Sequence, residues 1–207
     1  MQIQRLGHDN EIPQRLIAAA AEVFARHGYA GTRVREIVRA ADVNLASVNY
    51  YFGGKEGLYA ATLQQLAEER LAQSAAAASE SVTPEEALGR QVLAILRRFV
   101  ENGRDSPLGR ILAHESMNPT VYFDRLIADI VRPELDRLRL IVQQVVPGRL
   151  DERAATRAAM SVLGQCVFYL FARGAVERLH PDLAGPGETE ALARHITVFS
   201  LAGLRGL

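Results

Sequence analysis

The sequence has no tryptophan, a single cysteine and a single lysine, and its formal net charge is zero. The lone Cys166 cannot form an intrachain disulfide, which is typical of a protein in a reducing compartment. A balanced charge provides no general attraction to nucleic acid, so any positive surface that faces DNA must be local. Because 48% of the residues are hydrophobic and only 6% are aromatic, the core is expected to consist mainly of aliphatic side chains and alanine.

Long hydrophobic runs are also missing. The most apolar stretch, residues 158–172, is interrupted by polar residues and bounded by Arg157 and Arg173. It is shorter than the roughly 20 residues that a helix needs to cross a bilayer, so we interpret it as a buried helix. Residues 1–14 contain no apolar central run and are not expected to be a signal peptide. These patterns predict a cytoplasmic protein with no membrane partner.

Sequence patterns for catalysis, metal binding and cofactor binding are absent as well. No nucleophile motif and no paired carboxylates occur in a recognisable context, so we do not expect an enzyme. His114, His180 and His195 have no second ligand at helical metal-site spacing, and we predict neither a metal nor a cofactor. Residues 53–55, Gly-Gly-Lys, lack the spacing of a phosphate-binding loop. Cys166 stands among apolar residues, which is more typical of a core position than of a redox sensor.

Apolar residues recur at helical spacing through nearly the whole chain, and no strand pattern competes with them. The predicted fold class is therefore all-α. Thr83-Pro84-Glu85-Glu86 has the pattern of a capping box at a helix start, and Pro133 is expected to kink or split its helix. The predicted helices span residues 16–27, 34–41, 45–51, 55–78, 84–101, 107–117, 120–146, 151–178 and 187–204.

The most informative segment is residues 32–58, which predicts two short helices joined by a sharp turn. Apolar residues between positions 34 and 41 share one face of the first helix. Residues 42–44 break this pattern, and Asn44 is a good N-cap for the second helix. The second helix is unusually polar and aromatic on the side that does not pack on the first. A helix pair that presents the N-terminal part of its second helix has the geometry that enters a DNA major groove.

At these residues the chain resembles the DNA-binding half of a TetR-type transcriptional regulator. Asp42 stands in the turn where that family usually has glycine, and Asn49 stands where many relatives have a tyrosine that contacts DNA. Since aspartate tolerates the left-handed backbone conformation, the turn is expected to be kept. The resemblance rests on Gly28-Tyr29, Thr32, Ile37, Ala41, Val43, Tyr51-Phe52 and Lys55-Glu56-Gly57-Leu58, in order and without gaps.

The resemblance implies a three-helix, helix-turn-helix DNA-binding domain at residues 1–58 and a helical effector-binding and dimerisation domain at residues 59–207. Thr32 and Lys55 are predicted to contact phosphates, which positions the domain without reading the base sequence. The predicted DNA-binding residues are Thr32, Arg33, Arg35, Asn44, Leu45, Ala46, Ser47, Asn49, Tyr50, Tyr51 and Lys55.

The C-terminal part of the chain carries a second resemblance, to the CecR-like branch of the same family. This resemblance implies dimerisation and the sensing of a small molecule, without identifying that molecule. It rests on Glu115, Asn118-Pro119-Thr120, Arg132-Pro133, Gly164-Gln165-Cys166, Tyr169 and residues 195–201.

Gln165, Tyr169 and Arg173 form a polar line at spacing i, i+4, i+8 on an otherwise apolar predicted helix. Burying such groups without partners costs about 1–3 kcal/mol each, so a ligand, neighbouring helices or a dimer mate must satisfy them. The predicted ligand-binding residues are Arg110, Glu115, Tyr122, Gln165, Tyr169 and Arg173. The last two predicted helices carry apolar rows that we predict to form a dimer interface, with Leu163, Val167, Leu170, Val198 and Leu201.

These patterns predict a homodimeric, ligand-responsive transcription factor, most often a repressor in the family it resembles. Two heads related by a two-fold axis would bind a pseudo-palindromic operator in double-stranded DNA, with half-sites about 34–36 Å apart or a multiple of that. The alternative is a helical small-molecule-binding or scaffold protein without sequence-specific DNA binding. Asn49 is the residue that keeps this alternative open.

Overall fold

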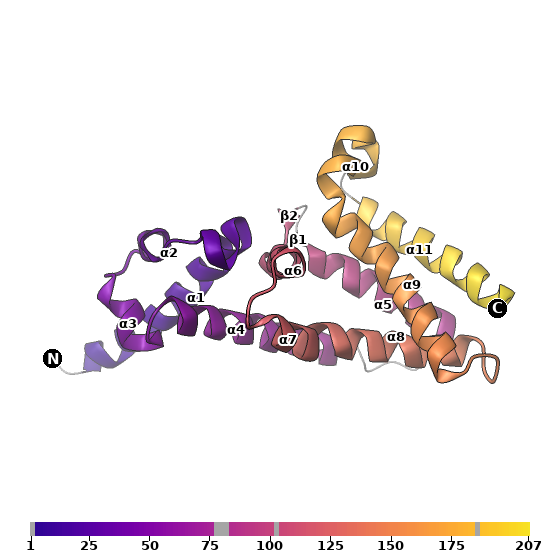
Figure 1. The fold of residues 1–207 in the computed structure, drawn as a ribbon, viewed down its shortest axis with the longest axis horizontal. Coiled ribbons are helices and arrows are strands. Elements are labelled where there is room, and N and C mark those ends of the chain that lie inside the picture. Colours follow the sequence, from indigo (N-terminus) through magenta and orange to yellow (C-terminus); the bar gives the residue numbers. More distant parts are fainter. Residues whose placement is uncertain (1–2, 77–82, 102–103, 185–186) are drawn as a thin grey trace. The chain divides into compact units, whose positions relative to one another are not determined.

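The computed structural model describes residues 3–76, 83–101, 104–184 and 187–207, and they are predominantly helical (Figure 1). A two-residue antiparallel strand pair, in which Val100 lies opposite Asp105, does not alter the class, and the predicted all-α fold is confirmed. The elements are α1 (Ile3–Gly31), α2 (Val34–Ala41), α3 (Ala46–Phe52), α4 (Lys55–Ala76), α5 (Pro84–Phe99), β1 (Val100–Glu101), β2 (Arg104–Asp105), α6 (Pro107–Met117), α7 (Phe123–Leu126), a π-helical segment (Ile127–Val131), α8 (Arg132–Val145), α9 (Glu152–Phe171), α10 (Arg173–Leu179), a 3₁₀ segment (Pro181–Ala184) and α11 (Glu188–Gly206).

The chain forms two compact units. The N-terminal unit comprises Met1–Ser79 and Arg110–Leu126, and the C-terminal unit comprises Glu80–Gly109 and Ile127–Leu207. The N-terminal unit therefore contains α1 to α4 together with most of α6 and α7. The predicted boundary after residue 58, between a DNA-binding domain and an effector-binding domain, stays a prediction. The compact N-terminal unit contains the first three helices together with α4 and residues 110–126.

Two glycines explain how the helices of the N-terminal unit come together. Gly28 interrupts α1 with a left-handed φ of 65°, and a Cβ at this position would lie 3.2 Å from Nδ1 of His114 in α6. Gly57 in the first turn of α4 has no space for a side chain, because a Cβ would lie 1.8 Å from the carbonyl oxygen of Phe52. This approach places the end of α3 directly against the start of α4, so Gly57→Ala would require the backbone to move.

Local capping signals predicted several helix starts correctly. Glu86 accepts a hydrogen bond from the backbone N–H of Thr83 at 2.9 Å, and its own N–H donates to Oγ1 of Thr83 at 3.3 Å. These bonds complete the predicted capping box. The N–H and the hydroxyl of Thr83 both donate to the Glu86 carboxylate, which lowers the pKa of Glu86. Asp151 accepts from the N–H of Ala154 at 2.7 Å and caps α9. The predicted loop after the fourth helix falls on residues 77–82, outside the described residues.

Two long predicted helices are divided in the structure. The helix predicted over residues 120–146 is split by the π-helical segment, and Pro133 lies in the first turn of α8, where its missing N–H is tolerated. The helix predicted over residues 151–178 was wrong in its continuity, because it breaks at Ala172. Apolar periodicity persists across this break, which is why the sequence did not reveal it.

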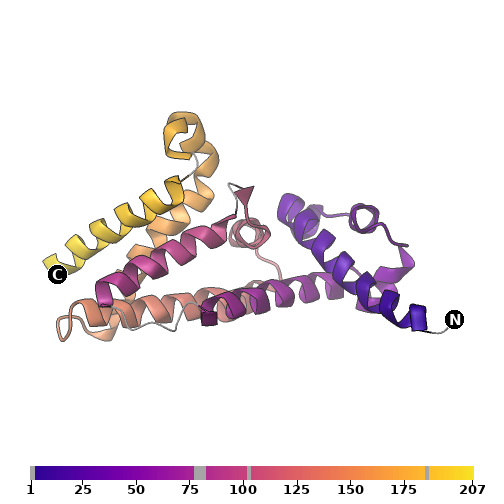
Figure 2. The same ribbon diagram turned by 180° about the vertical axis from the view of Figure 1, so that it is seen from behind.

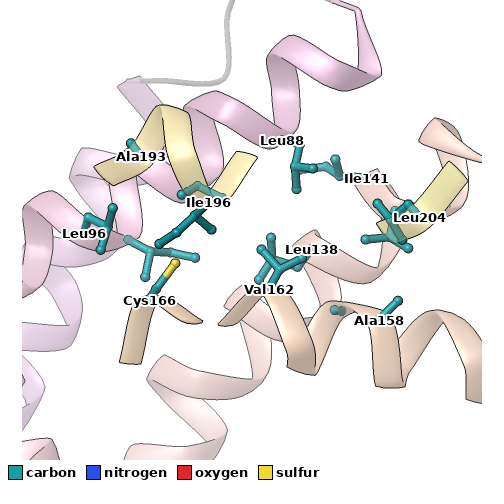
Figure 3. Close-up of a cluster of buried hydrophobic side chains, with 14 of the residues drawn as sticks. Leu88, Leu96, Leu138, Ile141, Ala158, Val162, Cys166, Ala193, Ile196 and Leu204 are labelled. Carbon is teal, nitrogen blue, oxygen red and sulfur yellow. The ribbon is translucent and has the colours of Figure 1, made fainter. Parts of the chain in front are cut away.

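The core of the C-terminal unit lies where α5, α8, α9 and α11 meet, and Figure 2 shows α5, α9 and α11 beside one another. Leu138 of α8 is fully buried between its neighbours, and Val162 of α9 and Ile196 of α11 join it in one cluster (Figure 3). Cys166 is fully buried in the same cluster, and burial raises the pKa of its thiol to about 12. A thiol that stays protonated at neutral pH fits the predicted packing role.

Among the described residues, no single helix is long and apolar enough to cross a bilayer; α9 and α10 meet that test only as a bent pair.

Candidate nucleic-acid interface

The turn between α2 and α3 keeps the sharp geometry that the sequence predicts. Asp42 adopts a left-handed conformation with φ 52° and ψ 54°. The N–H groups of Asp42 and Val43 donate to carbonyl oxygens in the last turn of α2, at 3.3 and 3.0 Å. Asn44 then accepts a hydrogen bond from the N–H of Ala46 through its side-chain oxygen at 2.9 Å. Asn44 therefore satisfies an N–H at the start of α3, as predicted, although the residue directly before the first helical residue is Leu45.

Packing determines which side of this helix pair faces solvent. Ile37, Val38 and Ala41 of α2 are buried, and Val48 of α3 is buried against the same core. Because helical residues three or four apart share a face, the residues of α2 and α3 that lie between the buried positions face outward. Tyr50 is 82% exposed on that outward side. The recognition surface predicted from the sequence is thus open to a large partner.

The predicted DNA-binding residues differ in their exposure. Thr32 is buried, and its hydroxyl donates to the carbonyl oxygen of Gly28 at 2.7 Å, so this side chain closes the end of α1. Its role as a phosphate contact stays a prediction. Ser47, Tyr51 and Lys55 are half-buried, and the exposed members are Arg33, Arg35, Asn44, Leu45, Ala46, Asn49 and Tyr50.

Lys55 lies at the first position of α4, next to the end of α3. Its ammonium group is 4.6 Å from the centroid of the Tyr29 ring, an arrangement in which the ring face attracts the cation. Partial desolvation lowers the pKa of Lys55. This contact orients the ammonium group at the start of α4.

Within the N-terminal unit, a buried hydrogen-bond network centres on Glu115 of α6, a residue that is 2% exposed. Its Oε1 accepts from the hydroxyl of Tyr59 in α4 at 2.7 Å, and its Oε2 accepts from the N–H of Thr120 at 2.9 Å. The Thr120 hydroxyl donates to Oε1 at 2.9 Å. Burial and then the bond to Glu115 raise the pKa of Tyr59, which keeps the phenol protonated as a donor.

Three of the predicted ligand-binding residues therefore have partners inside the N-terminal unit. Both oxygens of Glu115 are occupied, Arg110 pairs with Glu22 at 3.0 Å, and the Tyr122 hydroxyl donates to the carbonyl oxygen of Glu56 at 3.4 Å. Nε of Arg110 is buried and has no hydrogen-bond partner among the described residues. A ligand role for these side chains stays a prediction. A ligand that bound to them would have to replace these hydrogen bonds and the ion pair.

The other three predicted ligand-binding residues lie in the C-terminal unit. Gln165 donates to the Ser200 hydroxyl of α11 at 3.1 Å. Arg173 pairs with Glu177 at 2.7 Å and belongs to α10, so the expected continuous polar line ends before it. Gln165 and Tyr169 line a surface groove of about 520 Å³, together with Ser161, Gly164, Phe168, His195 and Ile196.

The residues predicted for the dimer interface are only partly on the surface. Leu163 and Leu201 pack against the core of the C-terminal unit, whereas Val198 is exposed. Val167 is half-buried, and the side chain of Leu170 lies outside the described residues. Sequence reasoning missed the large apolar side chains that α9 and α11 expose, which are Met160, Phe168, Phe171 and Phe199. We call these four residues and Val198 the exposed apolar face.

A helical chain with a solvent-facing helix-turn-helix belongs to a large class of DNA-binding proteins, and comparison with known proteins narrows this class. Residues 16–62 match the model of the bacterial regulatory proteins of the tetR family. Residues 84–204 match the model of the C-terminal domain of the HTH-type transcriptional dual regulator CecR. The chain therefore belongs to the TetR family of bacterial transcriptional regulators, in the branch with a CecR-type C-terminal domain, and it is a DNA-binding transcriptional regulator.

Individual relatives agree with this family. The chain is 27% identical to the HTH-type transcriptional repressor NicS of Pseudomonas putida over 93% of this chain and 90% of that protein. It is 50% identical to the probable HTH-type transcriptional regulator YttP of Bacillus subtilis, although that match spans 44 residues and only 21% of either chain. The crystal structure of the regulator FadR from Bacillus subtilis in complex with stearoyl-CoA shares the fold, with a TM-score of 0.69, 18% identity and coverage of 92% of this chain and 98% of that one.

Proposed function

We propose that this regulator is a homodimeric repressor that binds an operator in the cytoplasm and is released from it by a small molecule. The observation that carries the proposal is the α2–turn–α3 pair, which buries one face and leaves its polar and aromatic face open. NicS, which resembles this chain over nearly its full length, is described as a repressor. FadR, which shares the fold, binds stearoyl-CoA. A scaffold protein without DNA binding is not favoured by these matches.

Release from DNA requires that the effector binds two states of the dimer unequally. If the effector prefers a state in which the heads do not fit both half-sites, DNA affinity falls by the same free energy as that preference. By reciprocity, operator DNA then lowers the affinity for the effector by the same factor. Release can therefore be measured as a loss of DNA affinity when effector is added, or as a loss of effector affinity when operator DNA is added.

The exposed side chains of α3 and its cap are the proposed base contacts. Asn49 and Tyr50 are exposed on α3, and Leu45 precedes its first residue. An asparagine can form two hydrogen bonds with adenine in the major groove, and apolar side chains contact the thymine methyl group. Arg33 and Arg35 are proposed as phosphate contacts beside Lys55, since they are exposed at the start of α2.

Lys55→Ala is expected to weaken DNA binding by a similar factor on the operator and on random DNA. Since one phosphate contact releases about one counterion, the slope of log affinity against log salt concentration should become shallower by about one. Titrations across a salt series measure this slope. Arg97→Ala removes one exposed positive charge from the C-terminal unit and should leave the slope unchanged. Equal slopes for wild type and Lys55→Ala would remove Lys55 from the phosphate contacts.

The exposed apolar face is the proposed dimer interface. Its members come from α9 and α11, which are neighbours in the C-terminal unit, and three of them are phenylalanines. Several large apolar side chains exposed on two neighbouring helices are typical of a binding site for another protein. A two-fold axis through this face would bring the same residues of both subunits together, as in most homodimers.

The effector is proposed to be a mostly apolar molecule with at least one polar group. The groove beside α9 has a volume within the range of ligand sites, about 300–1,000 Å³. Tyr169, Gln165 and His195 line it together with Phe168, which also belongs to the exposed apolar face, so the groove borders the proposed interface. Apolar walls with a few placed polar groups are usual in small-molecule sites.

Tyr169→Phe should lower effector affinity by about 0.5–1.5 kcal/mol, because it removes one hydrogen-bonding group and little volume. DNA affinity without effector should not change. Thermal-shift screening of a metabolite library identifies the effector, and calorimetry compares the variants. Tyr50→Phe is the matched control for effector affinity, because Tyr50 is exposed on α3 and is not among the predicted ligand-binding residues. If an effector that releases DNA binds wild type and Tyr169→Phe equally, the groove beside α9 is not its site.

The test of the function as a whole is unbiased selection of DNA from random oligonucleotides. The proposal expects an enriched pseudo-palindrome with half-sites one helical turn, or a multiple of it, apart. Selection of no common sequence, or of a single unpaired half-site, would contradict the dimeric operator-binding function.

A further inference from the structure

Arg15, in the middle of α1, reaches the turn between α2 and α3. Its Nη2 donates to the carbonyl oxygen of Ala41 at 2.5 Å and to that of Asp42 at 3.1 Å. The same nitrogen lies 3.4 Å from Oδ2 of Asp42. One guanidinium group therefore serves both backbone and side-chain oxygens at the point where the chain leaves α2.

This turn contains an aspartate in a left-handed conformation. Asp42 is the single non-glycine residue with positive φ among the described residues. Side chains disfavour this region because Cβ approaches the carbonyl oxygen, whereas glycine adopts it freely. The last carbonyl oxygens of a helix also lack partners within that helix. Arg15 supplies a charged donor to two of them, so it stabilises the end of α2 and the conformation of Asp42 together.

The hydrogen bonds from Arg15 to the two backbone carbonyl oxygens contribute more to holding the turn than its ion pair with Asp42 does. The side chain of Asp42 is 99% exposed and that of Arg15 is 47% exposed, and solvent screens ion pairs of this kind. A hydrogen bond from a charged donor to a backbone carbonyl also has a directional effect, because it restricts where the peptide groups of residues 41 and 42 point. These peptide groups set the direction in which the chain enters α3.

Arg15 also compensates charge on the DNA-binding surface. Residues 32–55 contain two acidic side chains, Glu36 and Asp42. Glu36 lies 3.7 Å from Nε2 of His27, and Asp42 lies beside Arg15. Without Arg15, the carboxylate of Asp42 would add uncompensated negative charge next to a helix that must approach phosphates.

We propose that Arg15 is a positioning residue for DNA recognition, which holds the turn between α2 and α3 in the left-handed conformation that Asp42 must adopt. This inference rests on the proposed operator binding and extends it to a residue outside the helix pair. Arg15 acts through Asp42, so its importance depends on which residue occupies the turn. A direct contact between Arg15 and a phosphate would not depend on that residue.

The experiment is a double-mutant cycle between Arg15→Ala and Asp42→Gly, measured on the DNA that wild type selects. Arg15→Ala alone should weaken binding by about tenfold, since it removes charged hydrogen bonds to the turn. In the Asp42→Gly background the same change should weaken binding by about threefold or less, because glycine adopts this conformation without support and only the contacts to the two carbonyl oxygens are then lost. Arg15→Lys should recover part of the affinity, since a single nitrogen makes all three contacts.

Amide hydrogen exchange in the free protein provides a readout that does not involve DNA. In Arg15→Ala, exchange of the Asp42 and Val43 amides should become faster, while that of the α4 amides stays unchanged. Arg26→Ala is the matched control, because Arg26 is an exposed arginine of α1 that hydrogen-bonds within its own helix. It should leave both exchange and DNA affinity close to wild type.

Two results would overturn the positioning role. One is an equal loss of affinity on Arg15→Ala in both backgrounds, with a salt slope shallower by about one, which would make Arg15 a direct phosphate contact. The other is unchanged exchange at Asp42 and Val43 in Arg15→Ala. A wild-type protein that selects no DNA would contradict the proposed function instead, and the exchange measurement would still decide whether Arg15 holds the turn.

Discussion

Phe168→Glu is expected to turn the dimer into a monomer at low micromolar concentration. Phe168 is 56% exposed on α9, so a glutamate there can be solvated in the single chain and should not unfold it. In a two-fold interface both copies of the new carboxylate would be buried, and burying an unpaired charge costs several kcal/mol. A cost of about 3 kcal/mol already weakens association more than a hundredfold.

Sedimentation of the variant, together with circular dichroism, would show whether association is lost while helicity is kept. Leu140→Glu is the matched control, because Leu140 is 53% exposed on α8 in the same unit and lies outside the exposed apolar face. The Phe168 variant should also lose most of its affinity for a two-half-site operator. If Phe168→Glu stays dimeric and Leu140→Glu dissociates, the interface lies on α8.

The interface residues predicted from the sequence are less suitable for this test. Leu201 packs partly against the core of the C-terminal unit. A glutamate there would destabilise the subunit as well as any interface, so loss of the dimer would have two explanations. Val198→Glu has no such problem, because Val198 is exposed. It should reproduce the result of Phe168→Glu.

Glu115→Ala is expected to have the largest effect on stability, lowering the free energy of unfolding by about 3 kcal/mol. The substitution leaves the Tyr59 hydroxyl and the N–H and hydroxyl of Thr120 without their acceptor. An unpaired buried donor costs about 1–3 kcal/mol, and solvent entering at Thr120 offsets part of the sum. Chemical denaturation of the two variants Glu115→Ala and Tyr59→Phe would measure the effect.

Tyr59→Phe is the conservative counterpart, since it removes one donor and leaves the carboxylate with its bonds to Thr120. It should cost about 1 kcal/mol in wild type. In the Glu115→Ala background it should cost close to nothing, because the hydroxyl has already lost its partner. Additive effects of the two substitutions would show that the bond between Tyr59 and Glu115 contributes nothing to stability.

The sequence alone determined those features of the protein that depend on near neighbours in the chain. Asn44 and the Thr83 capping box were recognised because each satisfies an N–H group two or three residues away. Helical periodicity identified the all-α class and the buried face of α2, since the period of the helix decides which residues share a face. The family motif from Gly28 to Leu58 supplied the DNA-binding assignment.

Tertiary structure decided which partners the side chains on each helix face contact. Nothing near Glu115 in the sequence shows that Tyr59, 56 positions earlier, donates to it, so this buried hydrogen bond could not be predicted. The apolar rows of α9 and α11 were visible, but not which members face the core and which face solvent. Arg15 was not singled out at all, because its partners in the turn lie 26 and 27 residues away. Local sequence specifies where a helix begins and which side is apolar, while the partner of a buried or exposed side chain depends on how distant segments pack.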